Sequence, residues 1–355
     1  MDDFKYKTAV IKVGTHVLTK ADGLLDEEII LQIVSQIATL KRAGVKVILV
    51  SSGAMGAGRA LIKESDGLSD VVRRQLLAAV GQVQLMNIYA KYFSAKNYLC
   101  AQVLAAKEDF RDRRHYLNMK NCFEALLRDD IVPIVNENDV VSVGELMFTD
   151  NDELAGLIAA MMNVDALIIL TTVSGVLDEQ GKLIPEVNGE INIEEQVSPG
   201  ISKMGRGGMR TKCRVALKVS SLGIPTYIVD GRQAGVLITI AQGKKIGTFF
   251  PAAARKSNVK KWIAQAQGQE KGEVWINKRA QEVLCEKGKA ASLLPVGVTK
   301  VEGDFNKGDI IKIRGEKGKE LGYGVAQYGA QQAREYIGKK GKRELVHYDY
   351  LYLQV

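Results

Sequence analysis

Residues 8–50 read TAVIKVGTHVLTKADGLLDEEIILQIVSQIATLKRAGVKVILV. Short runs rich in Val and Ile lie at each end, at 8–13 and 45–50. Between them, apolar residues recur at the spacing of one helix face: Ile30, Ile33, Val34 and Ile37. Asp26 is placed to cap the amino terminus of this helix and Gly44 to end it. The stretch therefore predicts one β-α-β unit.

The first 250 residues continue this alternation of β-branched runs and amphipathic stretches. Such alternation is typical of an α/β domain with a mainly parallel sheet. The expected strands are 8–13, 45–50, 98–103, 131–135, 166–170 and 226–229.

Residues 251–272, PAAARKSNVKKWIAQAQGQEKG, interrupt the pattern with small, basic and amide side chains, which predicts a domain boundary. Beyond it, short apolar runs alternate with glycine turns, so a small β-rich module is expected, with strands near 273–276, 309–314 and 322–327. The predicted division is an α/β domain at 1–252, a linker at 253–271 and the β-rich domain at 272–355.

Composition excludes several classes of protein. The four cysteines show no C-x-x-C spacing and the three histidines are isolated, so neither a zinc site nor a disulfide framework is expected, and no metal-ligating residues are predicted. No segment reaches the roughly 18 uninterrupted apolar residues of a membrane helix, and the amino-terminal residues do not resemble a signal peptide. We expect a cytoplasmic protein with no membrane partner.

The net charge of +8 comes from the end of the chain. Residues 252–355 hold 20 Lys and Arg against 12 Asp and Glu, so the remainder is balanced. Basic segments with interleaved tyrosines can bind RNA, which is an alternative function for this part. A charge excess of this size more often reflects solvated surface than a binding site. We therefore expect the β-rich domain to pack on the α/β domain or on another subunit.

Ligands of open parallel sheets bind beyond the carboxyl ends of the strands, and four candidate segments follow strands here. The first holds Lys12 and Gly14, where the lysine either contacts a phosphate or lies along a strand edge. The second is 50–60, VSSGAMGAGRA, which leads into a helix and is neither a P-loop nor a Rossmann fingerprint. Each motif taken alone is weak.

The other two candidate segments carry more charge. The third gathers polar residues at a strand end and a helix start: Asn136, Asn138, Asp139, Asp150, Asn151 and Asp152. Its three carboxylates exceed what capping and turns require. The fourth is the glycine-rich loop 202–212, SKMGRGGMRTK, with Arg206, Arg210 and Lys212. Two lysines, backbone amides and Mg²⁺ suit phosphoryl transfer to an acceptor that is already anionic, because such an acceptor needs no general base.

These segments, in this order, resemble the amino acid kinase family and, within it, the glutamate 5-kinase family with its carboxy-terminal PUA domain. The resemblance covers nearly the whole chain and rests on IKVGTHVLT, SSGAMGAGR, QLLAAVGQ, PIVNENDVV, DNDELA and GRGGMRTK. It implies a three-layer αβα sandwich and transfer of the γ-phosphate of ATP to the side-chain carboxylate of L-glutamate, the first step of proline biosynthesis. A family member with another acceptor is the alternative enzyme.

The resemblance also implies roles for individual residues. Lys12 and Lys212 would stabilise the ATP phosphates, and Asp152 would organise both lysines. The residues that match the glutamate site are Ser52, Asp139 and Asn151, with Asn136 close by. The residues that match the nucleotide site, besides Lys12, are Thr171, Thr172, Arg206, Gly207, Gly208, Met209, Arg210, Thr211 and Lys212. Homo-oligomers and feedback inhibition by proline are further implications.

Two departures from the family pattern concern the nucleotide. The strand ending at Leu170 is followed by Thr171 and Thr172, where the family usually has Thr-Asp. The next segment, 175–187, is shorter than usual. Both departures affect the expected nucleotide contacts more than glutamate binding.

Overall fold

The computed structural model describes residues 4–62, 67–142, 148, 150–187, 208–254, 260, 263, 270–286 and 291–353. The chain forms two compact units, Met1–Arg255 and Lys256–Val355. Most of the predicted linker lies outside the described residues, so the three domain bounds stay a prediction. Within the described ranges, every helix is too short or too polar to cross a bilayer.

The first unit is built on a seven-stranded sheet in the order β3-β4-β2-β1-β5-β6-β7. All neighbouring pairs are parallel except β6 and β7. The strands are β1 (Thr8–Val13), β2 (Lys46–Ser51), β3 (Cys100–Ala105), β4 (Val132–Glu137), β5 (Ala166–Thr171), β6 (Thr226–Asp230) and β7 (Thr248–Phe250). The six predicted strands are confirmed, with bounds that move by no more than two residues.

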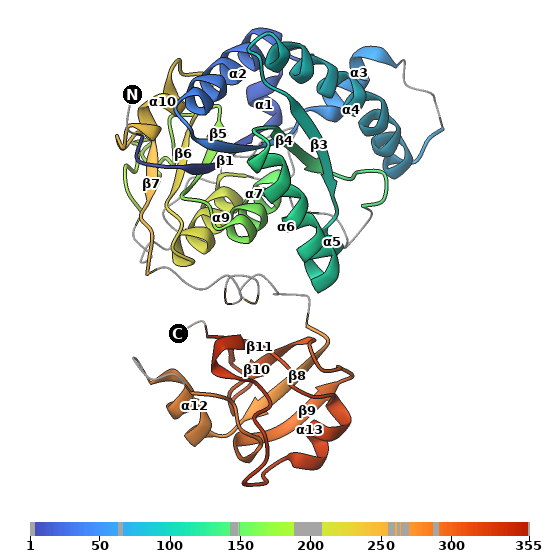
Figure 1. The fold of residues 1–355 in the computed structure, drawn as a ribbon, viewed down its shortest axis with the longest axis vertical. Coiled ribbons are helices and arrows are strands. Elements are labelled where there is room, and N and C mark those ends of the chain that lie inside the picture. Colours follow the sequence, from blue (N-terminus) through green and yellow to red (C-terminus); the bar gives the residue numbers. More distant parts are fainter. Residues whose placement is uncertain are drawn as a thin grey trace. The chain divides into compact units, whose positions relative to one another are not determined.

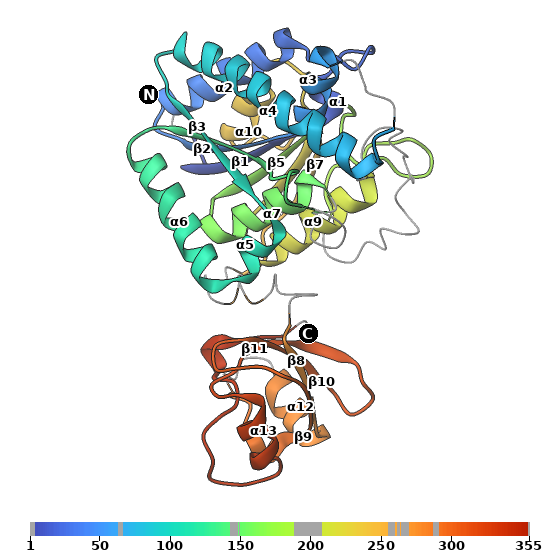
Figure 2. The same cartoon turned by 90° about the vertical axis from the view of Figure 1, so that its right-hand side faces the viewer.

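Helices cover both faces of this sheet, so the predicted three-layer αβα sandwich is confirmed (Figures 1 and 2). One face carries α1 (Thr15–Leu18), α2 (Glu27–Arg42), α3 (Ala54–Leu61), α4 (Asp70–Ser94) and α10 (Val236–Ala241). The other carries α5 (Lys107–Arg111), α6 (Arg113–Arg128), α7 (Asn151–Met162) and α9 (Met209–Ser221). The caps predicted for α2 are also confirmed, because Asp26 accepts from the Ile29 amide and Gly44 has a φ of +83°.

The second unit contains a five-stranded sheet in the order β12-β11-β10-β8-β9, which confirms the β-rich prediction. Its strands are β8 (Gly272–Ile276), β9 (Val298–Gly303), β10 (Ile310–Arg314), β11 (Glu320–Val325) and β12 (Leu351–Leu353). Its helices are α12 (Lys278–Cys285) and α13 (Ala330–Tyr336), with 3₁₀ turns at Pro295–Gly297 and Tyr348–Tyr350.

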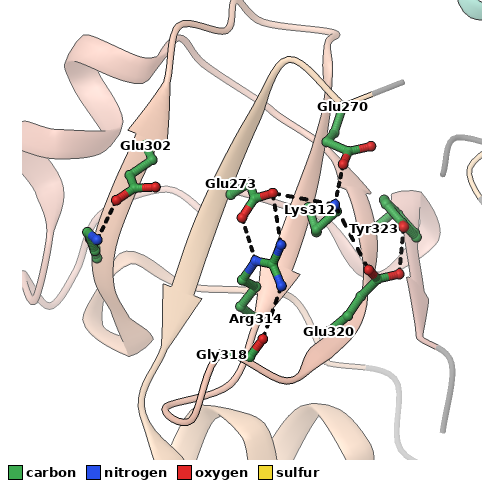
Figure 3. A network of polar contacts seen from close by, with 9 residues as sticks. Glu270, Glu273, Glu302, Lys312, Arg314, Gly318, Glu320 and Tyr323 are labelled. Atoms are coloured by element: carbon green, nitrogen blue, oxygen red, sulfur yellow. Dashed lines mark hydrogen bonds and ion pairs between the residues drawn. The ribbon is translucent and has the colours of Figure 1, made fainter. Parts of the chain in front are cut away.

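The two faces of β10 differ in chemistry. Ile311 and Ile313 are fully buried in the core of the second unit. Lys312 and Arg314, on the opposite face, form an ion-pair network with three glutamates of the unit: Glu270, Glu273 and Glu320 (Figure 3). From Ile311 to Arg314 the side chains alternate between the two faces, with the period of two expected of a strand.

Two glycines let α3 and α4 approach each other closely. A Cβ on Gly81 would lie 1.7 Å from the carbonyl oxygen of Ala54, and one on Gly58 would lie 2.1 Å from that of Leu77. Only hydrogen fits at either position, so the two helices are held in backbone contact.

We predict that Gly81→Ala lowers the free energy of unfolding by about 2–3 kcal/mol, because the added methyl group forces the two backbones apart. The gain of about 1 kcal/mol in helix propensity does not offset this. Urea unfolding measures the difference. Val83→Ala on the same helix, where the side chain is 63% exposed, should change the free energy by less than about 0.5 kcal/mol. Wild-type stability of Gly81→Ala would contradict the close approach.

Candidate active site

The predicted site residues lie at the carboxyl ends of the central strands. β1 is the central strand, with β2 on one side and β5 on the other. The chain moves outward from β1 through β2 on one side and later through β5 and β6 on the other. The edge beyond β1 and β5 is therefore a topological switch point, where ligands of open α/β sheets bind.

Lys12 enters this site because of the strand period. Ile11 and Val13 belong to the core cluster on the α2 side of the sheet. Lys12, between them, turns to the opposite face, where α7 begins, and is only 4% exposed. A buried lysine in a central strand requires a partner for its charge.

That partner is Asp152, which also binds a second lysine. The Lys12 Nζ forms an ion pair of 2.6 Å with Asp152 Oδ1. The Lys212 Nζ, from the first turn of α9, donates to Asp152 Oδ2 at 2.8 Å. The aspartate is completely buried and the Lys212 side chain is 13% exposed. One carboxylate thus holds two ammonium groups from distant parts of the chain.

Charge compensation governs this cluster. Burial by itself would raise the pKa of Asp152, but the charges of Lys12 and Lys212 outweigh burial and hold this pKa well below its ordinary value. Burial would likewise lower the pKa of Lys212, yet Asp152 raises it. Asp152 and Lys212 therefore stay ionised. The two lysines and one carboxylate have a formal net charge of +1, which favours an anionic ligand next to them.

Asp150 fixes the start of α7. Its Oδ1 accepts from the amides of Asp152, at 2.8 Å, and Glu153, at 3.2 Å, as an N-cap should. Burial and the neighbouring charge of Asp152 raise the pKa of Asp150 to about 6. Its Oδ2 is buried and has no hydrogen-bond partner among the described residues.

Neutral side chains form the adjoining part of the site. The Asn151 Nδ2 donates to Ser52 Oγ and to Asn136 Oδ1, each at 2.9 Å. Ser52 follows β2, where Gly53, at a φ of +105°, allows the sharp turn into α3. The structure thus brings three of the four predicted glutamate-site residues together in one hydrogen-bonded cluster.

The fourth, Asp139, lies on the loop after β4 and faces α4. Its Oδ1 is 3.5 Å from the Arg74 Nη2. Burial raises the pKa of Asp139 above its ordinary value, and the charge of Arg74 opposes that rise. The neighbouring Gln75 donates to the Val140 carbonyl at 2.7 Å. Arg74 and Gln75 were not predicted, because a helix sequence does not say which loop its side chains reach.

Some of the residues predicted for the nucleotide site are among the described residues, and these lie at the carboxyl ends of the central strands. Thr171 ends β5, and Thr172 follows it with an exposed side chain. Gly208 is the N-cap of α9, and its first four residues are Met209, Arg210, Thr211 and Lys212. Arg206 and Gly207 lie outside the described residues.

Glu137 is a buried carboxyl group that sequence reasoning missed. It ends β4, is 8% exposed, and its Oε1 accepts from the Phe148 amide at 2.9 Å. Burial and, to a smaller extent, the charge of Asp139 raise the pKa of Glu137 to about 7. The folded chain therefore keeps a proton at pH 6 that the unfolded chain has released.

We predict that part of the stability of the wild-type protein is lost as the pH rises from 5 to 8, and that Glu137→Gln removes on the order of 1 kcal/mol of this loss. The sign follows from the raised pKa in the folded state. Urea unfolding at pH 5, 6, 7 and 8 measures the slope. The exposed Glu124→Gln should leave the slope unchanged. An identical slope in Glu137→Gln would show that this carboxyl group is already ionised at pH 5.

Comparison with known proteins agrees with this geometry. A family model described as the amino acid kinase family matches residues 7–230, and one described as the PUA domain matches 272–346. The chain is 51% identical to a glutamate 5-kinase of Chlorobaculum tepidum over 98% of each chain. It is 44% identical to a glutamate 5-kinase of Bacteroides thetaiotaomicron over 99% of each chain.

Among solved structures, the chain resembles a carbamate kinase from Giardia lamblia bound to AMP-PNP. The TM-score is 0.51 at 19% identity, and the match covers 70% of this chain and 99% of the other, a likeness that concerns the fold alone. The family model and the curated relatives show in addition that the amino-acid sequence is similar. The chain therefore belongs to the amino acid kinase family, with a PUA domain following the kinase domain.

Proposed function

We propose that this chain transfers the γ-phosphoryl group of ATP to the side-chain carboxylate of L-glutamate, giving L-glutamyl 5-phosphate for proline biosynthesis. The observation that carries the proposal is the buried Asp152 holding Lys12 and Lys212 at the switch point of the sheet. The two curated relatives named glutamate 5-kinase, which match almost the full chain, support the choice of acceptor.

The reaction needs charge cancellation more than proton transfer. A carboxylate oxygen of glutamate attacks the γ-phosphorus, the bond to the β,γ-bridging oxygen breaks, and ADP leaves with that electron pair. The acceptor is already ionised, so no general base is required. Because acceptor and phosphate repel each other, groups that stabilise the equatorial phosphate oxygens lower the barrier most.

Lys12 and Lys212 are placed for that task. Asp152 leaves the pair with an excess positive charge and fixes both Nζ atoms around one carboxylate. In this proposal Asp152 is a positioning group and does not react. Preorganised charges of this kind cost no rearrangement during the reaction.

Glutamate would bind beside these lysines, on Ser52, Asn136 and Asn151. Asp139 would attract its ammonium group, since that carboxylate is the charged member of the predicted glutamate site. Arg74 holds Asp139 in place at 3.5 Å. The hydrogen-bonded amides suit recognition, because they desolvate at lower cost than charges.

ATP would lie along Thr171, Thr172 and the loop and helix start that comprise Arg206, Gly207, Gly208, Met209, Arg210, Thr211 and Lys212. Mg²⁺ commonly binds through substrate phosphates and one or two carboxylates. Among the described residues, no group of three or more His, Cys, Asp or Glu could hold a metal ion. The buried Oδ2 of Asp150 fits a single carboxylate contact to a magnesium ion carried by ATP, which would neutralise further phosphate charge.

Feedback inhibition by proline, assembly into homo-oligomers and a cytoplasmic location stay predictions. Another acceptor for the kinase, or RNA binding by the second unit, is not favoured by the curated relatives.

The acceptor is tested directly by incubating the purified protein with ATP and Mg²⁺ plus glutamate, N-acetylglutamate, carbamate or UMP. We expect ADP release with glutamate, together with a hydroxamate when hydroxylamine traps the acyl phosphate. Turnover of N-acetylglutamate without turnover of glutamate would overturn the proposal.

We predict that Lys12→Met and Lys212→Met each lower kcat for glutamate by about 100- to 1,000-fold, because each removes one cation from the transferring phosphoryl group. Lys46→Met is the matched control. This lysine lies at the amino-terminal end of β2, away from the carboxyl ends where the site lies, and its variant should keep kcat within about twofold. Steady-state ADP release measures all three. Normal kcat in either lysine variant would refute the assigned role.

A further inference from the structure

Gln82 presents a buried polar group that the proposed roles leave unexplained. It lies on α4 next to Gly81, where the helix packs closely on α3. Its side chain is 8% exposed. Its Oε1 accepts from the Asn136 Nδ2 at 2.9 Å.

The orientation of this amide follows from its neighbours. The Asn136 Oδ1 accepts from the Glu137 backbone amide at 2.9 Å, and a backbone N–H can only donate. The other end of the Asn136 side chain is therefore the NH₂ group, which donates to Gln82. Gln82 must present its oxygen to Asn136, so its own Nε2 is left as the remaining donor.

The Gln82 Nε2 is buried and has no hydrogen-bond partner among the described residues. Buried polar atoms in folded proteins almost always have partners, and leaving one without a partner is destabilising. A buried amide whose orientation is fixed, and whose donor is unused, is what a binding site for an oxygen-bearing ligand requires.

The position of Gln82 indicates which oxygen. Asn136, which Gln82 contacts, also accepts from Asn151, and Asn151 donates to Ser52. Asn151 directly precedes Asp152, the aspartate that holds both lysines. Gln82 is thus separated from the phosphoryl-transfer end by two hydrogen-bonded side chains and belongs to the opposite end of the glutamate site.

We propose that the Gln82 Nε2 donates a hydrogen bond to the α-carboxylate of bound glutamate and so selects acceptors that carry this group. The inference rests on the proposed function. The γ-carboxylate must reach the lysines, and Asp139 is assigned to the ammonium group. The α-carboxylate is then the group that accepts a hydrogen bond from the Gln82 Nε2. Arg74, on the same helix as Gln82, holds Asp139, so α4 aligns both contacts to the α-carbon end of the substrate.

The test is Gln82→Glu, which keeps an oxygen for the Asn136 Nδ2 and replaces the donor with a second oxygen. Loss of a hydrogen bond to a charged group should raise the KM for glutamate about 10- to 100-fold. The KM for ATP should stay within about twofold. Gln84→Glu, the same substitution two residues along α4, should leave both constants unchanged.

Two competitive inhibitors separate substrate contact from a structural effect. Glutarate lacks the ammonium group but has both carboxylates, whereas 4-aminobutyrate lacks the α-carboxylate. Gln82→Glu should raise the inhibition constant of glutarate about 10- to 100-fold and leave that of 4-aminobutyrate within about twofold. Equal increases for both inhibitors would overturn the inference, because a distorted site would weaken both.

The outcomes keep this inference distinct from the proposed function. A wild-type protein without glutamate-dependent ADP release would overturn the function itself. An active wild type with an unchanged KM in Gln82→Glu would overturn only the role of Gln82. If Gln82→Glu does not fold, Gln82→Met removes the donor without adding charge, and the same changes in KM and in the two inhibition constants are expected.

Discussion

A single buried carboxylate, held between two lysines, is the interaction on which the rest of this structure depends. Lys12 comes from the central strand, Asp152 from the first turn of α7 and Lys212 from the first turn of α9. Removing one partner from a buried ion pair typically costs 3–5 kcal/mol. The cluster therefore joins the sheet to the two helices on one of its faces, and it lies at the carboxyl ends of the central strands.

The second half of the site is neutral and depends on α4. Gly58 and Gly81 bring this helix into backbone contact with α3, which begins just after Ser52. From that position α4 reaches the loop after β4 through Gln82 and Arg74. In the proposed function the molecule thus separates two tasks: the charged groups would bind the phosphate, while the amides and one compensated carboxylate would bind the acceptor.

Much of this arrangement could be predicted from sequence. β1 has the predicted bounds because a central strand of apolar residues has a strong signal, and α2 has both predicted caps. The four candidate segments at strand ends followed from the rule for parallel sheets, whereas the residues assigned to ATP and glutamate came from the family resemblance. β7 was missed because three residues before a proline carry little periodicity. Gln82, Arg74 and Glu137 were missed because their partners are set by packing between distant segments. No local pattern reports that an amide donor is left unused.

In the proposed mechanism Asp152 holds both lysines in the geometry that transfers the phosphoryl group. Asp152→Asn keeps the size of the side chain but removes the charge that binds two ammonium groups. Its kcat for glutamate-dependent ADP release, measured on protein whose circular dichroism matches wild type, tests the claim most directly. We predict a fall of at least about 100-fold. A kcat within about twofold of wild type would contradict it.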